Sequence, residues 1–289
     1  LYVPHVEASF FGRHIRVNNA QAIRSILKEK RPVIFLGCHA GSWELSNIAT
    51  AHLFHEAPYA MLARPQARTP RLDAFLNRIR EGRSCHVIRT HELKRMVEHL
   101  SAGGMLGMVA DHGGKEGTLV SFFGQLAMTP TGGMKLARKM NAQIVLAFMH
   151  RLSGSHHEMM FAVHELIDGP DPKDDLRMNL EAINRVFEGW IRQYPQEYLW
   201  TFRRWKHSPQ KSVLVVSDGK AGHAKQSLAL VHTVRGLGFD VTSDTVDMKI
   251  TNAFKPEGEY GQRAMGIAVE GKLKSAFGGG EAEGIKLPA

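Results

Sequence analysis

Residues 33–44, VIFLGCHAGSWE, decide the fold of this chain. The first four are apolar and predict a short buried strand, and apolar residues recur at helical spacing from 43 to 54. Gly37 and Gly41 allow a tight turn between the two elements, and Ser42 suits the N-cap of the helix. A strand that turns directly into a helix is the repeating unit of α/β folds, so we expect a layered α/β domain.

The turn carries His39, and the first turn of the following helix carries Glu44. Within one regular helix, residues five apart lie off a common line, but a histidine in the loop can approach a glutamate in the next turn. An imidazole oriented by a carboxylate is the usual construction of a general base, so we predict that Glu44 fixes the tautomer of His39. The alternative is a polar turn histidine followed by a glutamate that complements the helix dipole.

Further apolar runs predict a series of strands separated by helices. The strands are expected at 33–37, 59–62, 86–88, 105–110, 144–149 and 160–163, and the helices at 20–29, 43–54, 70–80, 92–100, 133–140 and 176–194. This alternation predicts a largely parallel or mixed central sheet flanked by helices, with sites beyond the carboxyl ends of the strands. Arg64 and Asp111 each follow a strand, so we expect them on the same rim as His39.

Composition limits the class of protein. The chain has 289 residues, 43% of them hydrophobic, which suits one large domain or two smaller ones with a buried core. Its formal net charge of +9 favours an acidic partner, such as a phosphorylated substrate, an anionic membrane surface or an acidic carrier protein. Zinc-finger spacing, aromatic ribonucleoprotein motifs and arginine-rich tracts are absent from the sequence, so we expect no nucleic-acid partner.

The sequence favours a cytosolic setting without a metal. Cys38 and Cys85 are too few for a disulfide framework, so a reduced environment is expected. The sixteen histidines include no His-Glu-x-x-His motif, and we expect no metal cofactor. No apolar run approaches the ~18 residues that cross a bilayer, so we expect the chain as given to be soluble or peripheral.

Five segments, in order along the chain, resemble motifs of the lipid A biosynthesis acyltransferases, the lauroyl and myristoyl transferases of Gram-negative bacteria. They are the His-x4-Glu segment 35–45, Ala63-Arg64-Pro65, Ala110-Asp111-His112, Phe122-Phe123-Gly124 with Thr129-Pro130-Thr131-Gly132, and Tyr198-Leu199-Trp200-Thr201-Phe202-Arg203-Arg204. The likeness spans roughly residues 10–209. Two positions depart from it, because His112 stands where the family usually has Gln and Phe202 where it often has His.

The resemblance implies a glycerolipid-acyltransferase-like fold and transfer of a fatty acyl group from an acyl carrier protein thioester to a hydroxyl of a phosphorylated glycolipid, a lipid A precursor. It implies action at the cytoplasmic face of the bacterial inner membrane, without a metal or redox cofactor. Family members usually carry a membrane-spanning segment before the region where this chain starts, so a lost amino-terminal anchor is expected. The implied catalytic residues are His39 and Glu44, and the implied substrate-binding residues are Arg64, Asp111, Arg203 and Arg204.

Each substrate-binding candidate also has a structural alternative. Arg64 can bind a phosphate or assist the thioester carbonyl, or it can be an exposed cation before a proline. Asp111 can orient Arg64 or a water molecule, or it can form a turn. Arg203 and Arg204 are interleaved with tryptophans, which suits a phosphorylated glycolipid at a membrane surface, but they can also form a solvated basic end.

The residues around His39 argue against an acyl-enzyme. Adjacent residues that leave a strand point to opposite faces, so Cys38 and His39 do not form a ready dyad, and the turn centres His39 rather than Ser42. Direct transfer is therefore predicted. Methionines 105, 108, 134 and 140 can line an acyl-chain tunnel, although core filling is the commoner use of methionine.

Composition changes after residue 209, and we predict an acyltransferase domain at 1–209 and a short C-terminal α/β extension at 210–289. A strand at 212–217 leads into SDGKAGH, residues 217–223, which with Gln226 resembles the start of the ELM-type family, whose fold is similar to the glycosyltransferase-B class. The remaining length would hold only the opening strand–helix unit of such a domain. The glycine-containing tail has few apolar residues and is expected to be poorly ordered.

We therefore interpret residues 1–209 as an O-acyltransferase of the lipid A type. Two alternatives stay open. One is the same chemistry on another lipid acceptor, such as a glycerophosphate, a phosphoinositol mannoside or an amino lipid. The other is a non-catalytic module that binds anionic lipid or a carrier protein, in which His39 and Glu44 are structural.

Overall fold

The computed structural model describes residues 8–81, 85–112, 116–217, 229, 232–233, 240–247, 273–274 and 281–282. The chain divides into two compact units, Leu1–His207 and Ser208–Ala289. The first unit carries every candidate site residue named above.

A seven-stranded sheet forms the centre of the first unit, with the strand order β1-β9-β8-β2-β5-β3-β4. The strands are β1 (Ile15–Asn18), β2 (Val33–Gly37), β3 (Tyr59–Ala63), β4 (Cys85–Arg89), β5 (Met105–Val109), β8 (Gln143–Arg151) and β9 (His157–His164). Neighbouring strands run parallel except β8 and β9, so β1 and β9 oppose the other five. The α/β fold with a mixed central sheet that the sequence predicts is confirmed.

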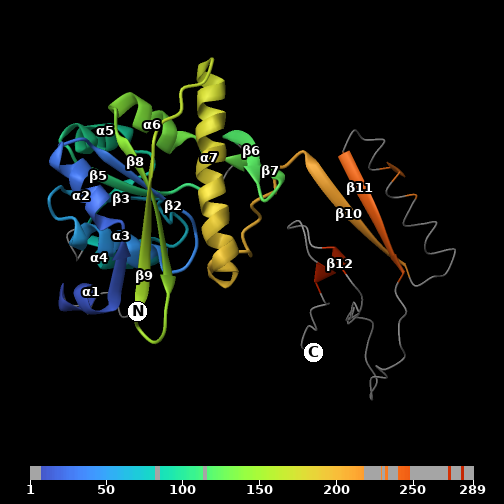
Figure 1. The fold of residues 1–289 in the computed structure, drawn as a ribbon, viewed down its shortest axis with the longest axis horizontal. Coiled ribbons are helices and arrows are strands. Elements are labelled where there is room, and N and C mark those ends of the chain that lie inside the picture. Colours follow the sequence, from blue (N-terminus) through green and yellow to red (C-terminus); the bar gives the residue numbers. More distant parts are fainter. Residues whose placement is uncertain are drawn as a thin grey trace. The chain divides into compact units, whose positions relative to one another are not determined.

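Helices cover both faces of this sheet (Figure 1). They are α1 (Ala8–His14), α2 (Ala20–Lys28), α3 (Trp43–Leu53), α4 (Pro70–Glu81), α5 (Leu93–Ser101), α6 (Gly132–Met140) and α7 (Pro172–Gln193). One hydrophobic core joins the sheet to α1, α2 and α3, and the other joins it to α5, α6 and α7. Two cores follow because every strand in the middle of the sheet presents apolar residues to both faces.

Strand β2 shows how the sequence builds both cores. Val33 and Phe35 belong to the core on the α3 side, whereas Ile34 and Leu36 belong to the core on the α7 side. Side chains alternate between the faces of a strand, so a continuous apolar run fills both layers. Burial on both faces holds β2 firmly, and the site begins where this strand ends.

A small hairpin lies against α7 (Figure 1). Its strands, β6 (Thr118–Phe122) and β7 (Gln125–Thr129), pair antiparallel around Phe123 and Gly124, which both have positive φ. Positive φ at both turn residues matches the twist of a tight hairpin, and glycine carries it without strain. The amide of Asn184 in α7 donates to the carbonyl of Ser121 at 2.9 Å and fixes the hairpin on the helix.

The predicted elements agree with the observed ones to within a few residues, apart from four differences. Helix α1, the hairpin and β1 are absent from the prediction, because none of them has an apolar run long enough to stand out. Helix α7 begins at Pro172 instead of 176, since Asp171 caps it by accepting hydrogen bonds from the backbone N–H groups of Lys173 and Asp174.

The second unit contains two pairs of strands in its described residues. Strand β10 (Gln210–Ser217) covers the strand expected at 212–217 and pairs in parallel with β11 (Asp240–Asp247), while β12 (Leu273–Lys274) pairs with β13 (Glu281–Ala282). Segment 218–223 and Gln226, which carry the ELM-type resemblance, lie outside the described residues, as does most of the tail.

None of the helices in the described ranges has both the length and the apolar composition to cross a lipid bilayer.

The division into units makes a prediction about truncation. A chain that ends at Ser208 should fold as a monomer, because residues 8–207 hold two complete hydrophobic cores. Its melting temperature, measured by circular dichroism, should stay within about 2–4 °C of that of the full chain, the shift that ~1 kcal/mol produces at this size. An aggregating product in size-exclusion chromatography would show that the first unit depends on the residues after 208.

Candidate active site

The candidate site lies where two neighbouring parallel strands end. Strand β2 ends at Gly37, and β5, which pairs with it, ends at Val109. The chain that follows each strand brings one polar residue to the same rim, His39 from β2 and Asp111 from β5. The rim predicted from the sequence is therefore present, because the carboxyl ends of parallel strands meet at one edge.

His39 and Asp111 are joined by two hydrogen bonds. Nδ1 of His39 lies 2.7 Å from Oδ1 of Asp111, and the backbone N–H of His39 donates to Oδ2 at 3.0 Å. Asp111 is only 1% exposed. Its carboxylate therefore fixes both the ring and the backbone of the histidine.

The charge state of Asp111 decides the tautomer of His39. Burial raises the pKa of Asp111, but the hydrogen bonds and the charge of His39 outweigh it, so the pKa lies below its usual value and the carboxyl is ionised. An ionised carboxylate only accepts hydrogen bonds, so Nδ1 must donate. Nε2 is then the nitrogen that can accept a proton from a substrate.

Backbone hydrogen bonds with residues 197–199 also hold the loop that carries His39. The N–H of Leu199 donates to the carbonyl of His39 at 2.9 Å, and the N–H of Gly41 donates to the carbonyl of Glu197 at 2.7 Å. Gly41 has φ +54°, and a Cβ there would collide with the carbonyl of Met149. Glycine is thus required at this position for the loop to pack against β8.

His112 stacks on His39, and Phe202 stacks on His112. The rings of His39 and His112 are parallel to within 8° with centroids 3.4 Å apart, and Phe202 stacks on the far face of His112 at 3.4 Å. Burial, together with the charges of His39 and Arg204, lowers the pKa of His112 to about 4, although the charge of Asp111 acts in the opposite direction. His112 is therefore neutral at physiological pH. The two positions that depart from the family's motifs form one stack.

Glu44 does not orient His39, which corrects our prediction from the His-x4-Glu spacing. Glu44 forms an ion pair with Arg80 of α4, and Nε of Arg80 donates to Oε2 of Glu44 at 3.0 Å. The side chain of Glu44 is 43% exposed. The buried Asp111 takes the orienting position instead. The prediction failed because the sequence does not reveal that β5 is the neighbour of β2.

Arg64 lies on the expected rim. It follows β3, the strand beside β5, and its side chain is exposed. Within the described ranges no carboxylate pairs with it, and Asp111 does not orient it as expected, since Asp111 bonds to His39.

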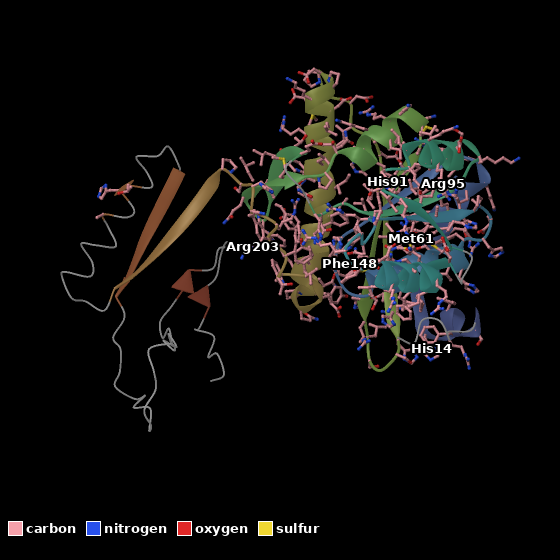
Figure 2. All side chains as sticks on the ribbon, turned by 180° about the vertical axis from the view of Figure 1, so that it is seen from behind. His14, Met61, His91, Arg95, Phe148 and Arg203 are labelled. Carbon is pink, nitrogen blue, oxygen red and sulfur yellow. The ribbon has the colours of Figure 1, made fainter. Side chains whose placement is uncertain are left out.

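The two arginines near residue 203 differ in role. Arg204 is buried: its guanidinium donates to the carbonyl of Met128 at 2.5 Å and to Oγ1 of Thr129 at 2.6 Å, and lies over the ring of Phe122. These contacts tie the segment to the hairpin, so the expected substrate-binding role of Arg204 is replaced by a structural one. Arg203 is exposed (Figure 2).

An apolar cavity of about 320 Å³ opens beside the pair. It lies between the sheet and helices α5, α6 and α7, and Ala110, the residue before Asp111, is part of its wall. Met108 and Met134 line it, whereas Met105 and Met140 do not. Other lining side chains are Leu36, Leu62, Leu93, Met96, Leu180 and Ile183. A cavity of this size and lining suits a long apolar group.

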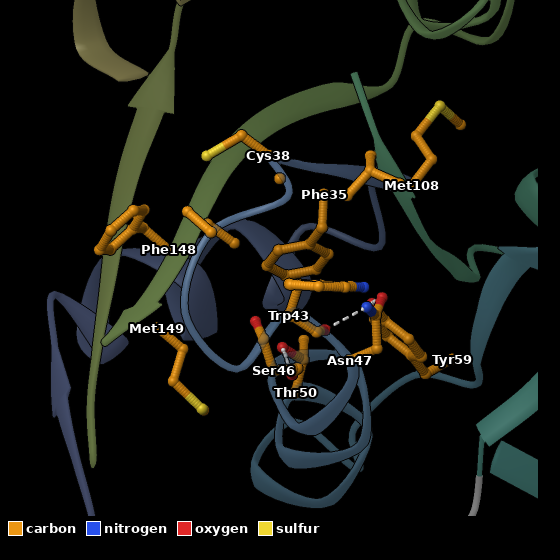
Figure 3. Close-up of a pocket in the computed structure, with 14 residues that line it drawn as sticks. Phe35, Cys38, Trp43, Ser46, Asn47, Thr50, Tyr59, Met108, Phe148 and Met149 are labelled. Carbon is orange, nitrogen blue, oxygen red and sulfur yellow. Dashed lines mark hydrogen bonds between the residues drawn. The ribbon is translucent and has the colours of Figure 1, made fainter. Parts of the chain in front are cut away.

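A second cavity, under the turn that carries His39, measures only about 20 Å³ (Figure 3). Ser46, Asn47, Thr50 and Tyr59 line it, and the Tyr59 hydroxyl is 2.7 Å from Oδ1 of Asn47. It has room for about one water molecule, so it is not a substrate pocket.

His39, Asp111 and His112 are also the one group among the described residues whose ligand atoms lie close enough to share a metal ion. One feature argues against that use. Nδ1 of His39 is already hydrogen-bonded to the carboxylate of Asp111. The arrangement is typical of an oriented base.

Cys38 lies beside His39 but is buried. Burial and the nearby charge of Asp111 raise the pKa of its thiol well above the usual value. The thiol therefore stays protonated and is a poor nucleophile, in agreement with the predicted absence of an acyl-cysteine.

Comparison with known proteins gives one consistent result. Residues 2–207 match the family model of the bacterial lipid A biosynthesis acyltransferases. The lipid A biosynthesis lauroyltransferase of Escherichia coli (strain K12) is 26% identical over 206 residues, which are 69% of this chain and 64% of that protein. The chain thus spans slightly less than two thirds of the length of this relative. The match covers the sheet, the His39–Asp111 pair and the cavity, and the chain belongs to the bacterial lipid A biosynthesis acyltransferase family.

Proposed function

We propose that the first unit transfers a fatty acyl group from an acyl carrier protein thioester to a hydroxyl of a phosphorylated lipid A precursor at the cytoplasmic face of the inner membrane. The observation that carries the proposal is the position of His39 and its buried partner Asp111 next to an apolar cavity of about 320 Å³, whose wall includes Ala110. Family membership supports the reaction class.

His39 acts as the general base. Its Nε2 accepts the proton of the acceptor hydroxyl while the hydroxyl oxygen attacks the thioester carbonyl, and Asp111 stabilises the imidazolium that forms. The tetrahedral intermediate collapses with cleavage of the carbon–sulfur bond. The imidazolium then returns the proton to the leaving thiolate, so the enzyme ends in its starting state. Base assistance of this kind contributes about 10²–10⁴ in rate.

The stack on His39 supports this mechanism. A neutral imidazole with its face on His39 adds no positive charge beside the imidazolium of the transition state. Phe202 presses on the other face of His112, and the strand-like segment at 198–199 holds the loop. The base is thus positioned by rigid neighbours, which lowers the reorganisation needed at the moment of reaction.

The cavity holds the acyl chain of the donor. Its apolar walls begin beside Ala110, so a chain that enters it brings the thioester to the level of Asp111 and His39. Exposed Arg64 and Arg203 are the cations that can meet a phosphate of the acceptor or the phosphopantetheine of the donor. The buried Arg204 takes no part in substrate binding.

A purely structural role for the His39–Asp111 pair explains the geometry less well. Burying an ionised carboxylate is costly, and a binding module gains nothing from a histidine whose second nitrogen is left with its lone pair available. A general base requires that arrangement.

Substitutions of the two carboxylates separate this mechanism from the one expected from the sequence. Asp111→Asn should lower kcat by a factor of about 10²–10⁴, because the base loses its orientation. His39→Ala should lower kcat by a similar factor, because the base is absent. Glu44→Gln is the matched control and should stay within a few-fold of the wild type. Turnover is measured with acylated carrier protein and a lipid A precursor, with melting temperature as a check on folding. A larger loss for Glu44→Gln than for Asp111→Asn would refute the assignment.

Two opposite changes at one cavity residue test the acyl site. Leu180 lines the cavity from α7, and Leu180→Phe should shorten the preferred acyl chain, whereas Leu180→Ala should lengthen it. Competition between carrier-bound donors of different length, followed by mass spectrometry of the product, reports both shifts. The alanine variant is expected to lose about 2–5 kcal/mol of stability, so it is assayed well below its melting temperature. If both variants keep the wild-type preference, the acyl chain binds elsewhere.

A further inference from the structure

Helix α4 leaves two large apolar side chains exposed. Neither hydrophobic core contains a residue of α4, although the helix has leucine, phenylalanine and isoleucine in its sequence. Its one buried side chain is the polar Asn77. A helix packed on a sheet ordinarily buries its apolar stripe, so this orientation requires an explanation.

Polar contacts fix the inner side of the helix. The guanidinium of Arg89 bonds to Asp73 at 2.6 Å, and Asn77 donates to the same carboxylate at 3.2 Å. One turn later, Arg80 pairs with Glu44. Asp73, Asn77 and Arg80 recur at intervals of four and three residues, so they form a single stripe toward the body of the protein. Burial of the Phe75 side of the helix would break all three contacts.

Two of the four large apolar side chains of α4, Leu72 and Phe75, lie on the outer side, whereas Leu76 and Ile79 are partly buried. Phe75 and Leu72 precede Asn77 by two and five residues, which at 100° per residue turns them well away from the buried side. Their side chains are 37% and 49% exposed. They are separated by three positions and are therefore neighbours on the helix surface.

Four exposed arginines lie on α4 or in the segment that leads into it. Arg64, Arg68, Arg71 and Arg78 are all exposed, and in the part of the chain that the structure describes none of them pairs with a carboxylate. The guanidinium of Arg78 lies over the ring of Phe75, 5.8 Å from its centroid. Arg64 is also on the rim of the candidate active site, directly after β3. We refer to Leu72, Phe75, Arg68, Arg71 and Arg78 as the α4 surface.

We propose that the α4 surface docks the protein on an anionic lipid bilayer, with Leu72 and Phe75 entering the interface and the arginines binding lipid phosphates. A short helix that presents an apolar stripe bordered by arginines has the composition of an interfacial helix. Its charge excludes a symmetric contact with a second copy, which would place arginine against arginine. Docking in this way would turn the rim that carries Arg64 and His39 toward the lipid that supplies the acceptor. This consequence rests on the proposed function.

The bilayer fits the α4 surface better than a carrier protein does. Recognition of an acidic protein requires guanidinium groups at defined positions, whereas no carboxylate in the described ranges holds the side chains of these arginines. Arginines on long flexible stems beside half-exposed apolar side chains suit a fluid layer of phosphates over hydrocarbon.

Co-sedimentation of the full chain with vesicles tests the proposal. We expect binding to vesicles of phosphatidylcholine mixed with phosphatidylglycerol, and much weaker binding to phosphatidylcholine alone or at high salt. Each arginine near an anionic surface contributes a factor of about 5, so Arg71→Ser with Arg78→Ser should weaken binding about 25-fold. Lys135→Ser with Lys139→Ser on α6 removes the same charge from exposed positions and should have little effect.

Matched leucine variants test insertion. Leu72→Ser should weaken vesicle binding several-fold, whereas Leu152→Ser, which changes an equally apolar side chain with 40% exposure between β8 and β9, should not. A fluorophore on Leu72→Cys should shift its emission to shorter wavelength when vesicles are added. Labelling is selective because Cys38 and Cys85 are buried. All of these side chains are exposed, so melting temperatures should change little.

The outcomes separate this inference from the proposed function. Vesicle binding needs no turnover, and transfer to an acceptor in detergent micelles should stay within a few-fold of wild type in all α4 variants. If the wild-type protein binds vesicles through α4 but transfers no acyl group, the proposed function is wrong and the docking inference still holds. Equal loss in the α6 and α4 charge variants would overturn the docking inference. So would α4 variants that bind vesicles normally and lose affinity only for acyl carrier protein, because the surface would then be a protein site.

Discussion

The two hydrogen bonds between Asp111 and His39 are the interaction on which the rest of the site depends. A carboxylate buried to this extent is tolerated only where hydrogen bonds and a partner charge compensate for its lost hydration. That compensation requires β2 and β5 to be neighbours and parallel, since only then do the loops after them meet. The two hydrophobic cores, one on each face of β2, therefore do more than stabilise the fold. They set the distance between a base and its orienting acid.

Around this pair the protein uses rigid neighbours of three kinds. The chain at 197–199 binds the loop of His39 through backbone hydrogen bonds. The ring of His112 stacks on the imidazole and is itself covered by Phe202, and Arg204 anchors the segment that follows residue 199 to the β6–β7 hairpin. The apolar cavity ends beside this group, and α4 presents its arginines beside the same rim. Acyl chain, base and basic surface thus converge at the carboxyl edge of one sheet, which is where parallel sheets place their sites.

The sequence predicts much of this arrangement and misses specific parts for physical reasons. Periodicity finds the long strands and helices because burial on one or two faces leaves a regular apolar pattern, and the strand-end positions of His39, Arg64 and Asp111 follow from it. Strand order leaves no local pattern, so Glu44, close in sequence, was chosen over Asp111, close in space. The roles of Arg203 and Arg204 are indistinguishable in sequence, since only the fold shows which of two adjacent arginines is buried. Helix α4 has an ordinary helical pattern, and only its contacts reveal that Leu72 and Phe75 face outward.

The central claim is that Asp111 holds His39 with Nδ1 protonated and Nε2 available as the base. Nitrogen-15 chemical shifts of the His39 imidazole, assigned by comparison with His39→Ala, test it most directly, because they distinguish a protonated ring nitrogen from one that bears a lone pair. The account predicts a proton on Nδ1, with its proton resonance shifted far downfield by the short hydrogen bond to the carboxylate, and a bare Nε2 in the neutral ring. A neutral His39 with the proton on Nε2, or an Nδ1 resonance that Asp111→Asn leaves unchanged, would contradict it.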